Sequence, residues 1–265
     1  FTMHIVVCVK QVPDTTDVKI NPETNTLIRK GVKSIINPFD ENAIEAALQI
    51  KDKYPDTKVT VLSMGPPQVD AMLKDCIAMG VDEAILLSDR NFAGADTLAT
   101  SYALSQAIRK LGDVDIILCG KQAIDGDTAQ VGPGIAEVLD INHITYVNKI
   151  EYDGGKSIRV HSNIDGGYMV LESAFPCLLT VLKTINQPRY PSLKGKMAAK
   201  KKEIPVWKAE DVGANFEKIG LKGSPTVVVK IFTPQAREGG EFIDGDTADD
   251  KAKKLVNHLK EMSVV

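Results

Sequence analysis

The chain has 265 residues, of which 43% are hydrophobic and 25% charged, and its formal net charge is −3. This composition is typical of a globular protein that buries a core, and the small charge excludes a general attraction to nucleic acid or to anionic membranes. We therefore expect no nucleic-acid partner. No apolar run approaches the roughly 20 residues of a membrane span, so we also expect no membrane insertion.

The first half of the chain alternates between apolar runs and segments with apolar residues at helical spacing. The apolar runs predict strands at 4–12, 58–65, 83–89 and 115–120. The amphipathic segments predict helices at 40–54, 68–80, 96–112 and 127–140. Short connections between alternating strands and helices predict a mainly parallel sheet with helices on both faces, an α/β fold of the Rossmann-like kind.

The second half of the chain changes pattern. Residues 144–162 and 163–182 alternate about the turns 153–155 and 165–167, both with the sequence Asp-Gly-Gly. This alternation predicts further strands that extend the sheet.

From Asn186 to about Gly245 the regular pattern fades, and an amphipathic helix follows at about 247–262. A segment this long without clear elements is unusual in a compact domain, so we expect an arm that rests on a partner.

Four cysteines are present, at positions 8, 76, 119 and 177, and none belongs to a Cys-X-X-Cys motif. Cys8 and Cys119 lie in expected strands, where a reduced cysteine behaves as a small hydrophobic residue. The histidines are scattered, so we expect no metal site, and we expect a reducing, cytoplasmic location.

Loops rich in Gly, Pro, Ser, Thr and Asp follow all four expected parallel strands. In an open parallel sheet, ligands bind beyond the carboxyl ends of the strands, so this edge predicts a binding site. The alternative is that loops simply favour these residue types.

The stretch "GKQAIDGDTAQVGPGIAE" at 120–137 lies at this edge. We expect Asp127 to cap the following helix, so that the backbone N–H groups of 128–130 can bind a diphosphate without a lysine. The Asp125 carboxylate would accept a hydrogen bond from a ribose hydroxyl group or point to solvent. The alternative is a capped helix with no ligand.

Gly132 and Gly134 lie inside this expected helix, where glycine costs roughly 1 kcal/mol against alanine. They predict that something packs closely against the helix. Two other helix starts are open to two interpretations: Asn37 to Asp40 form a turn and a cap or hold adenine or ribose, and Thr97 is structural or contacts a phosphate or the edge of a cofactor.

No nucleophile motif, carboxylate pair or His-Glu-X-X-His motif is present. A bound cofactor would therefore have to supply any chemistry.

Five motifs resemble the β subunit of electron transfer flavoprotein: "VCVKQVPDT" at 7–15, "IINPFDENAIEAAL" at 35–48, the stretch at 120–137, "DGG" at 165–167 and "NQPRYPSLKGKMAAKKK" at 186–202. The resemblance implies a fold related to adenine-nucleotide-binding domains, a heterodimer with an α subunit, and bound AMP or FAD. It implies an α/β nucleotide-binding domain at 3–185, followed at 186–265 by a partner-recognition loop and C-terminal arm with a terminal helix.

Thr97 is a cofactor-binding candidate from its place at a helix start. The cofactor-binding residues that the resemblance implies are Val9, Asn37, Pro38, Phe39, Asp40, Met64, Gly120, Lys121, Gln122, Ala123, Ile124, Asp125, Gly126, Asp127, Thr128, Ala129, Gln130 and Val131. In the loop at 186–202, the resemblance implies that Leu193 is the apolar anchor for a dehydrogenase, between Tyr190 and Lys200, Lys201 and Lys202. The alternative for this loop is a solvated basic segment.

Residues 12–31 and "DGDTAQ" are similar to the electron-bifurcating members of the family. That branch implies FAD reduced by NADH, with one electron passing through the α subunit to an acyl-CoA dehydrogenase-type flavoenzyme and the other to ferredoxin or flavodoxin. The alternatives are a non-bifurcating β subunit with structural AMP, and a nucleotide-sensing module without flavin.

Overall fold

The computed structural model describes residues 3–14, 20–21, 26–27, 34–230 and 239–265. The chain divides into two compact units, Phe1–Val229 and Lys230–Val265. This division differs from the expected boundary after residue 185, because helix α5 (Leu193–Lys201) packs on α2 and strand β13 (Val206–Trp207) pairs with β7 within the first unit.

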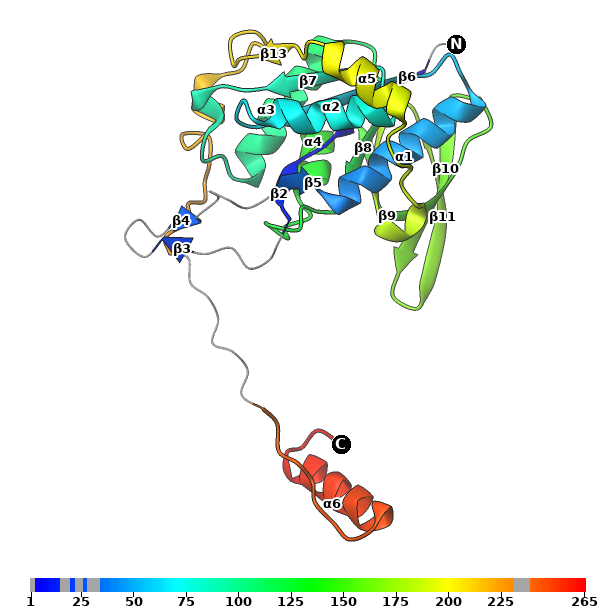
Figure 1. The fold of residues 1–265 in the computed structure, drawn as a ribbon, viewed down its shortest axis with the longest axis vertical. Coiled ribbons are helices and arrows are strands. Elements are labelled where there is room, and N and C mark those ends of the chain that lie inside the picture. The colour runs from blue at the N-terminus through cyan, green and yellow to red at the C-terminus, as the bar shows by residue number, and fades with distance from the viewer. Residues whose placement is uncertain (1–2, 15–19, 22–25, 28–33, 231–238) are drawn as a thin grey trace. The chain divides into compact units, whose positions relative to one another are not determined.

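The first unit contains a nine-stranded sheet with the order β11-β10-β9-β12-β8-β1-β6-β7-β13 (Figure 1). Its other strands are β1 (His4–Cys8), β6 (Lys58–Met64), β7 (Glu83–Leu87), β8 (Ile116–Gly120), β9 (Asn142–Glu151), β10 (Ser157–Ile164), β11 (Gly167–Ala174) and β12 (Cys177–Val181). From β9 to β13 the neighbours pair in parallel, and the β10 pairs are antiparallel. The expected α/β fold with a mainly parallel sheet is confirmed.

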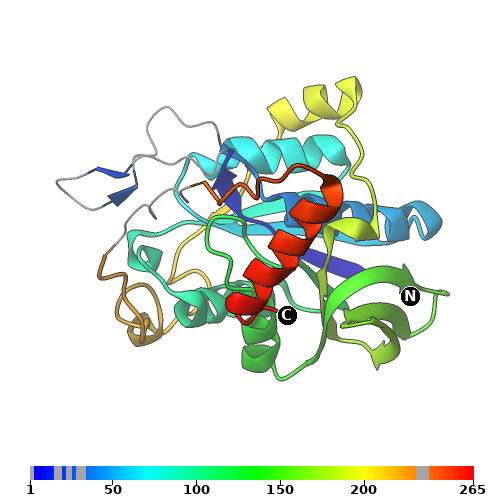
Figure 2. The ribbon, with the colours of Figure 1, turned by 90° about the horizontal axis from the view of Figure 1, so that it is seen from below.

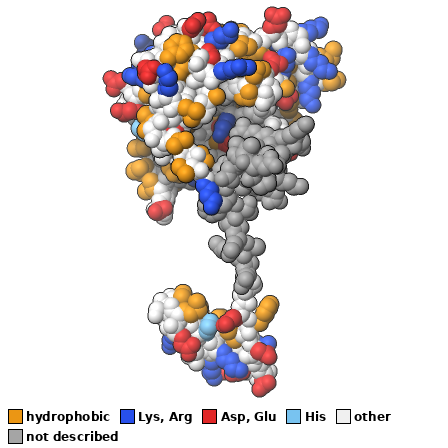
Figure 3. Space-filling model, turned by 90° about the vertical axis from the view of Figure 1, so that its left-hand side faces the viewer, with side chains coloured by type: hydrophobic (Ala, Val, Ile, Leu, Met, Phe, Trp, Pro, Cys, Tyr) orange, Lys and Arg blue, Asp and Glu red, His pale blue; other side chains and the backbone are white. Residues whose placement is uncertain are grey.

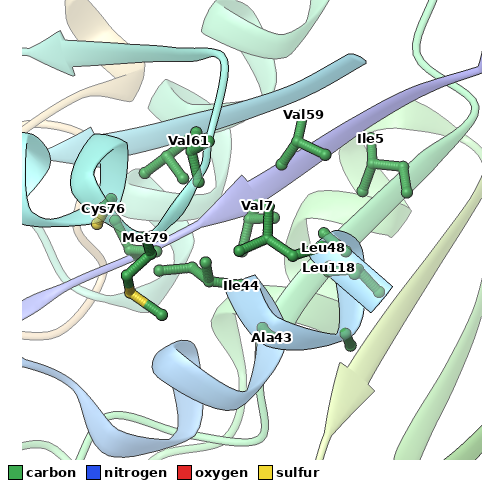
Figure 4. Close-up of a cluster of buried hydrophobic side chains, with 14 of the residues drawn as sticks. Ile5, Val7, Ala43, Ile44, Leu48, Val59, Val61, Cys76, Met79 and Leu118 are labelled. Carbon is green, nitrogen blue, oxygen red and sulfur yellow. The ribbon is translucent and has the colours of Figure 1, made fainter. Parts of the chain in front are cut away.

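The helices cover both faces of the sheet (Figure 2). On one face, α1 (Pro38–Lys53), α2 (Val69–Met79) and α5 contribute to a core with one side of the strands, part of which Figure 4 shows. On the other face, α3 (Thr97–Leu111) and α4 (Val131–Leu139) form a second core. The central strands are apolar on both sides because each faces two helical layers, as their continuous apolar runs predict.

Strand β1 lies at the centre of the parallel part of the sheet, which runs from β9 to β13. The chain continues from it to β6 and β7 on one side, and β8 and β12 lie on the other. The connections after β1 and β8 therefore lead in opposite directions. At such a point, α/β proteins bind ligands beyond the carboxyl ends of the strands.

Several boundaries differ from expectation. The strand expected at 4–12 is two strands, because the chain leaves the sheet after β1 and Gln11–Pro13 (β2) pairs with Ser34–Ile36 (β5). Helix α1 begins at Pro38, with Asn37 rather than Asp40 at its N-cap. The basic segment expected as a loop contains the helix α5, whose N-cap Ser192 accepts a hydrogen bond from the Gly195 N–H.

The two Asp-Gly-Gly turns are where the sequence predicts them, between β9 and β10 and between β10 and β11. In the second unit, α6 (Ala248–Glu261) confirms the expected terminal helix, and Thr247 caps it. Ile20–Asn21 (β3) and Thr26–Leu27 (β4) form a short antiparallel pair.

The surface carries charges of both signs. On the face of the first unit seen in Figure 3, basic and acidic side chains alternate with apolar ones. Among the residues that the structure describes, no helix has the length and apolar character needed to cross a membrane. All four cysteines are buried and unbridged.

Candidate functional site

The Asp40 side chain forms hydrogen bonds with the backbone at the ends of both diverging strands, β1 and β8. Its carboxylate accepts the Lys10 N–H at 2.8 Å and the Gly120 N–H at 3.1 Å. A Cβ at Gly120 would lie 2.3 Å from this carboxylate and 2.6 Å from the Phe39 Cβ. The start of α1 therefore packs against the bare backbone where β8 ends.

Asn37 fixes the loop that follows β8. Its Nδ2 donates to the Gln122 carbonyl at 2.8 Å, and its Oδ1 accepts the Ile124 N–H at 3.1 Å. Because the polar atoms of Asn37 and Asp40 are engaged with backbone groups, the structure favours the turn-forming role for these residues over a direct grip on adenine or ribose.

Burial has an electrostatic consequence at Asp40. The loss of solvent around the carboxyl raises its pKa to about 7, against the lowering effect of the N–H groups that it accepts. The site thus contains one buried acid that changes its charge near neutral pH.

The loop at 121–130 exposes free backbone N–H groups. Asp127 and Ala129 both have φ 53°, and Gln130 is right-handed, so successive N–H groups can converge into an anion-binding nest. The N–H groups of 128–132 donate no hydrogen bond to any described residue. They also lie at the positive end of α4, which favours a bound phosphate.

Asp127 does not cap α4, contrary to the sequence-based prediction. The helix begins at Val131, with Gln130 at its N-cap, because the left-handed residues at 127 and 129 interrupt any earlier turn. The Asp127 carboxylate accepts a hydrogen bond from the Gln122 side chain instead. Asp125 forms an ion pair with Lys10 at 2.6 Å, so its carboxylate reinforces the loop.

The remaining expected residues surround this loop. Thr97, the first residue of α3, donates to Gln130 Oε1 at 2.8 Å. Val9 is buried after β1, and Met64 ends β6. The Ala123 carbonyl accepts the N–H groups of Gly126 and Asp127 and closes the turn.

The close packing predicted at Gly132 and Gly134 is present. The atoms that pack against the two glycines belong to side chains of the protein itself. A Cβ at Gly132 would lie 2.6 Å from the Thr180 Cγ2, and one at Gly134 would lie 2.5 Å from the Ser101 Oγ. These contacts set α4 against β12 and α3. Lys10, Ser101 and Thr180 were not predicted as site residues, since no local pattern indicates which loop each one meets.

Within the described residues, no three His, Cys, Asp or Glu side chains gather as a metal site would require. A cavity of about 310 Å³ lies near the start of β9, lined by Glu137, Asp140 and Phe175 among others. It lies at the amino ends of the strands, away from the nest.

Comparison with known proteins places the chain in a family. The sequence matches the family described as "Electron transfer flavoprotein domain" over residues 24–212. The chain belongs to the electron transfer flavoprotein family.

Three relatives of this electron transfer flavoprotein chain match nearly its whole length. "Caffeyl-CoA reductase-Etf complex subunit CarD" of Acetobacterium woodii is 53% identical and covers 99% of this chain and 100% of that protein. "Electron transfer flavoprotein subunit beta" of Megasphaera elsdenii is 53% identical, with coverage of 99% and 98%. "Protein FixA" of Azotobacter vinelandii is 50% identical, with coverage of 94% and 91%. The resemblance to β subunits is confirmed.

The electron transfer flavoprotein chain presents the residues expected to contact a dehydrogenase on its surface. Tyr190 is 93% exposed and Leu193 is 78% exposed, and Lys200 and Lys201 are exposed on α5. Lys202 is different, because its ammonium group donates to the Asp82 carbonyl.

Arg189 holds the segment 186–192, which precedes α5, against α1. Its guanidinium contacts Glu45 at 2.8 Å and Asp52 at 2.6 Å, and Asn42 donates to the Asn186 carbonyl at 2.9 Å. The two carboxylates raise the pKa of Arg189 further above its already high value. The exposed Tyr190 is therefore presented by a fixed backbone.

We expect Arg189→Met to release the segment, because the nearly buried Glu45 loses its partner. Backbone amide exchange over 186–192 should become at least tenfold faster. Arg159→Met, which removes an exposed pair with Glu172 at 3.4 Å, is the control and should leave exchange in that segment unchanged. Equal exchange in wild type and Arg189→Met would contradict the anchoring role.

Proposed function

We propose that this chain is the β subunit of an electron-bifurcating electron transfer flavoprotein and that the nest at 128–132 binds the diphosphate of FAD. The observation that carries the proposal is the set of N–H groups at the start of α4 that donate to no acceptor within the described part of the chain. They follow β8, whose end diverges from that of β1. A phosphate at this place would receive hydrogen bonds that no described residue now accepts.

The residues present fit such a group. Both nearby carboxylates in the loop are engaged, Asp125 by Lys10 and Asp127 by Gln122, which lessens their repulsion of an anion. Gly120 keeps the strand end free of a side chain, while Asn37 and Asp40 fix the backbone on either side. When bound, the flavin supplies the one- and two-electron chemistry, and the protein supplies its position.

The proposed partners follow from the family and from the presented surface. An α subunit completes the heterodimer, NADH is the electron donor, and ferredoxin or flavodoxin is the low-potential acceptor. An acyl-CoA dehydrogenase-type flavoenzyme docks on Tyr190, Leu193 and α5, as suits a relative named as a subunit of a caffeyl-CoA reductase-Etf complex. We propose that the complex works in the cytoplasm.

Flavin counting tests the proposal. The chain, purified with its α partner, should contain two flavins per heterodimer by its visible spectrum and by release of cofactor on denaturation. One flavin together with one AMP would instead support a non-bifurcating β subunit. Absence of both flavin and AMP would refute the electron-carrier role and favour a nucleotide-sensing module.

We expect Leu193→Ala to slow electron transfer to the dehydrogenase about tenfold, because it removes an exposed apolar contact from the centre of the docking surface. NADH oxidation by an artificial dye should be unaffected. Val206→Ala, at a 52% exposed valine on β13, is the control and should change neither rate. Unchanged transfer in Leu193→Ala would remove this surface from the proposal.

A further inference from the structure

Tyr146 has a backbone conformation that a bulky residue rarely adopts. Its φ is 55°, in the middle of the ten-residue strand β9. The pairing register with β12 shifts between Leu179 and Val181, opposite this residue. Such strain costs about 1–3 kcal/mol and is retained where the surrounding structure enforces it, often at functional sites.

Two hydroxyl groups hold the irregular backbone. The Tyr146 N–H donates to Thr180 Oγ1 at 3.3 Å, and the Ser162 hydroxyl donates to the Thr145 carbonyl at 2.7 Å. The same Thr180 packs its methyl group against Gly132 in the first turn of α4. Tyr146 is therefore connected through one side chain to the helix that bears the nest.

The position of Tyr146 is at the carboxyl edge of the sheet. The neighbouring Val147 pairs with Val181, and the carbonyl of Val181 accepts the Lys121 N–H at 2.9 Å. Lys121 is the first residue of the loop that leads to the nest. The Tyr146 ring thus stands beside the start of this loop.

The ring and Lys121 form a pair. The Lys121 ammonium lies 5.1 Å from the centroid of the Tyr146 ring, and Tyr146 as a residue is 41% exposed. Lys121 forms no ion pair with the residues that the structure describes. The ring face attracts and orients the ammonium group without neutralising its positive charge.

If the positive φ at position 146 served only the backbone of β9, glycine or asparagine would adopt it with less conformational strain than tyrosine. The strain is therefore better explained by a requirement for the ring at this place. The ring contacts the ammonium group of Lys121. Since no carboxylate of a described residue pairs with that group, it suits an anionic ligand.

We propose that Tyr146 is a positioning residue for nucleotide binding, which holds the Lys121 ammonium so that it binds a phosphate of the ligand beside the nest. This inference rests on the proposed function, since the ligand is the same nucleotide, and it adds to the backbone N–H groups a side-chain cation and the residue that orients it. A flexible lysine loses less conformational freedom on binding when its orientation is already restricted.

The test uses the heterodimer freed of nucleotide, with FAD and AMP as separate probes. In Tyr146→Asn, the melting temperature of the nucleotide-free protein should stay equal or rise, because asparagine relieves the strain. The dissociation constant of the bound probe should increase about tenfold. An unchanged dissociation constant would overturn the proposal, whatever happens to the melting temperature.

A double-mutant cycle separates positioning from general damage. Lys121→Gln should weaken binding about tenfold, and adding Tyr146→Asn to it should weaken binding little further, because the ring acts through the lysine. Tyr146→Phe, which keeps the ring face, should bind as wild type. Additive losses in the double variant would overturn the proposal.

Tyr168→Asn is the matched control. Tyr168 is 58% exposed on β11, stacks on His161 and has no positive φ, so its substitution should leave nucleotide binding unchanged. If the wild-type heterodimer binds neither FAD nor AMP, the proposed function fails and this positioning role fails with it. If wild type binds and the Tyr146 variants bind equally well, only the positioning role fails.

Discussion

Gly120→Ala should destabilise the first unit by about 3 kcal/mol, which corresponds to a fall of roughly 6–12 °C in its melting temperature. The added methyl group would lie 2.3 Å from the Asp40 carboxylate and 2.7 Å from the Phe39 backbone carbonyl carbon. Backbone cannot rotate away as a flexible side chain can, so the start of α1 must move. That movement breaks the hydrogen bonds that join β1 to β8 through Asp40.

Thermal unfolding and nucleotide retention measure this effect together. Gly126→Ala is the control in the same loop, because nothing lies within 4 Å of its Cβ and its φ is not in the left-handed region. This variant should unfold at the same temperature as wild type. Wild-type stability in Gly120→Ala would show that the contact between α1 and β8 is looser than the structure indicates.

Asp40→Asn should change how stability depends on pH. The folded pKa of about 7 lies above the ordinary value of 3.8, so between these values the folded state holds a proton that the unfolded state has released. Protonation therefore stabilises the fold at low pH, and this contribution is lost as pH rises towards 7. Between pH 5 and pH 8 the loss amounts to about 2–3 kcal/mol.

In wild type, we expect the free energy of unfolding in urea to fall by about this amount from pH 5 to pH 8, beyond the change from other groups. Asp40→Asn should lack this component. It should also be less stable than wild type at pH 5 by about 1–3 kcal/mol, because its amide nitrogen cannot accept one of the two N–H groups. The exposed Asp56→Asn is the control and should follow the wild-type profile. Parallel profiles for wild type and Asp40→Asn would show that Asp40 does not titrate in this range.

The two predictions concern one joint in the fold, where a helix start meets two strand ends. Asp40 and Gly120 are 80 residues apart in sequence, and Asn37 lies 87 residues from the Ile124 amide that it accepts. The resemblance to a family indicated that these residues belong to one site. It did not indicate that the side chains of Asn37 and Asp40 form hydrogen bonds with backbone groups of the protein.

The amino-acid sequence alone determined the layered α/β fold, because the continuous apolar run of β1 and the helical spacing in α3 are local patterns of burial. It also indicated close packing at Gly132 and Gly134, since glycine inside a helix has a local cost.

Only the tertiary structure decided where α4 begins, which groups Asp127 and Arg189 contact, and that a tyrosine in β9 has a positive φ. These features depend on backbone strain and on hydrogen bonds between distant segments. Their energies arise only when those segments meet, so no local pattern in the chain records them.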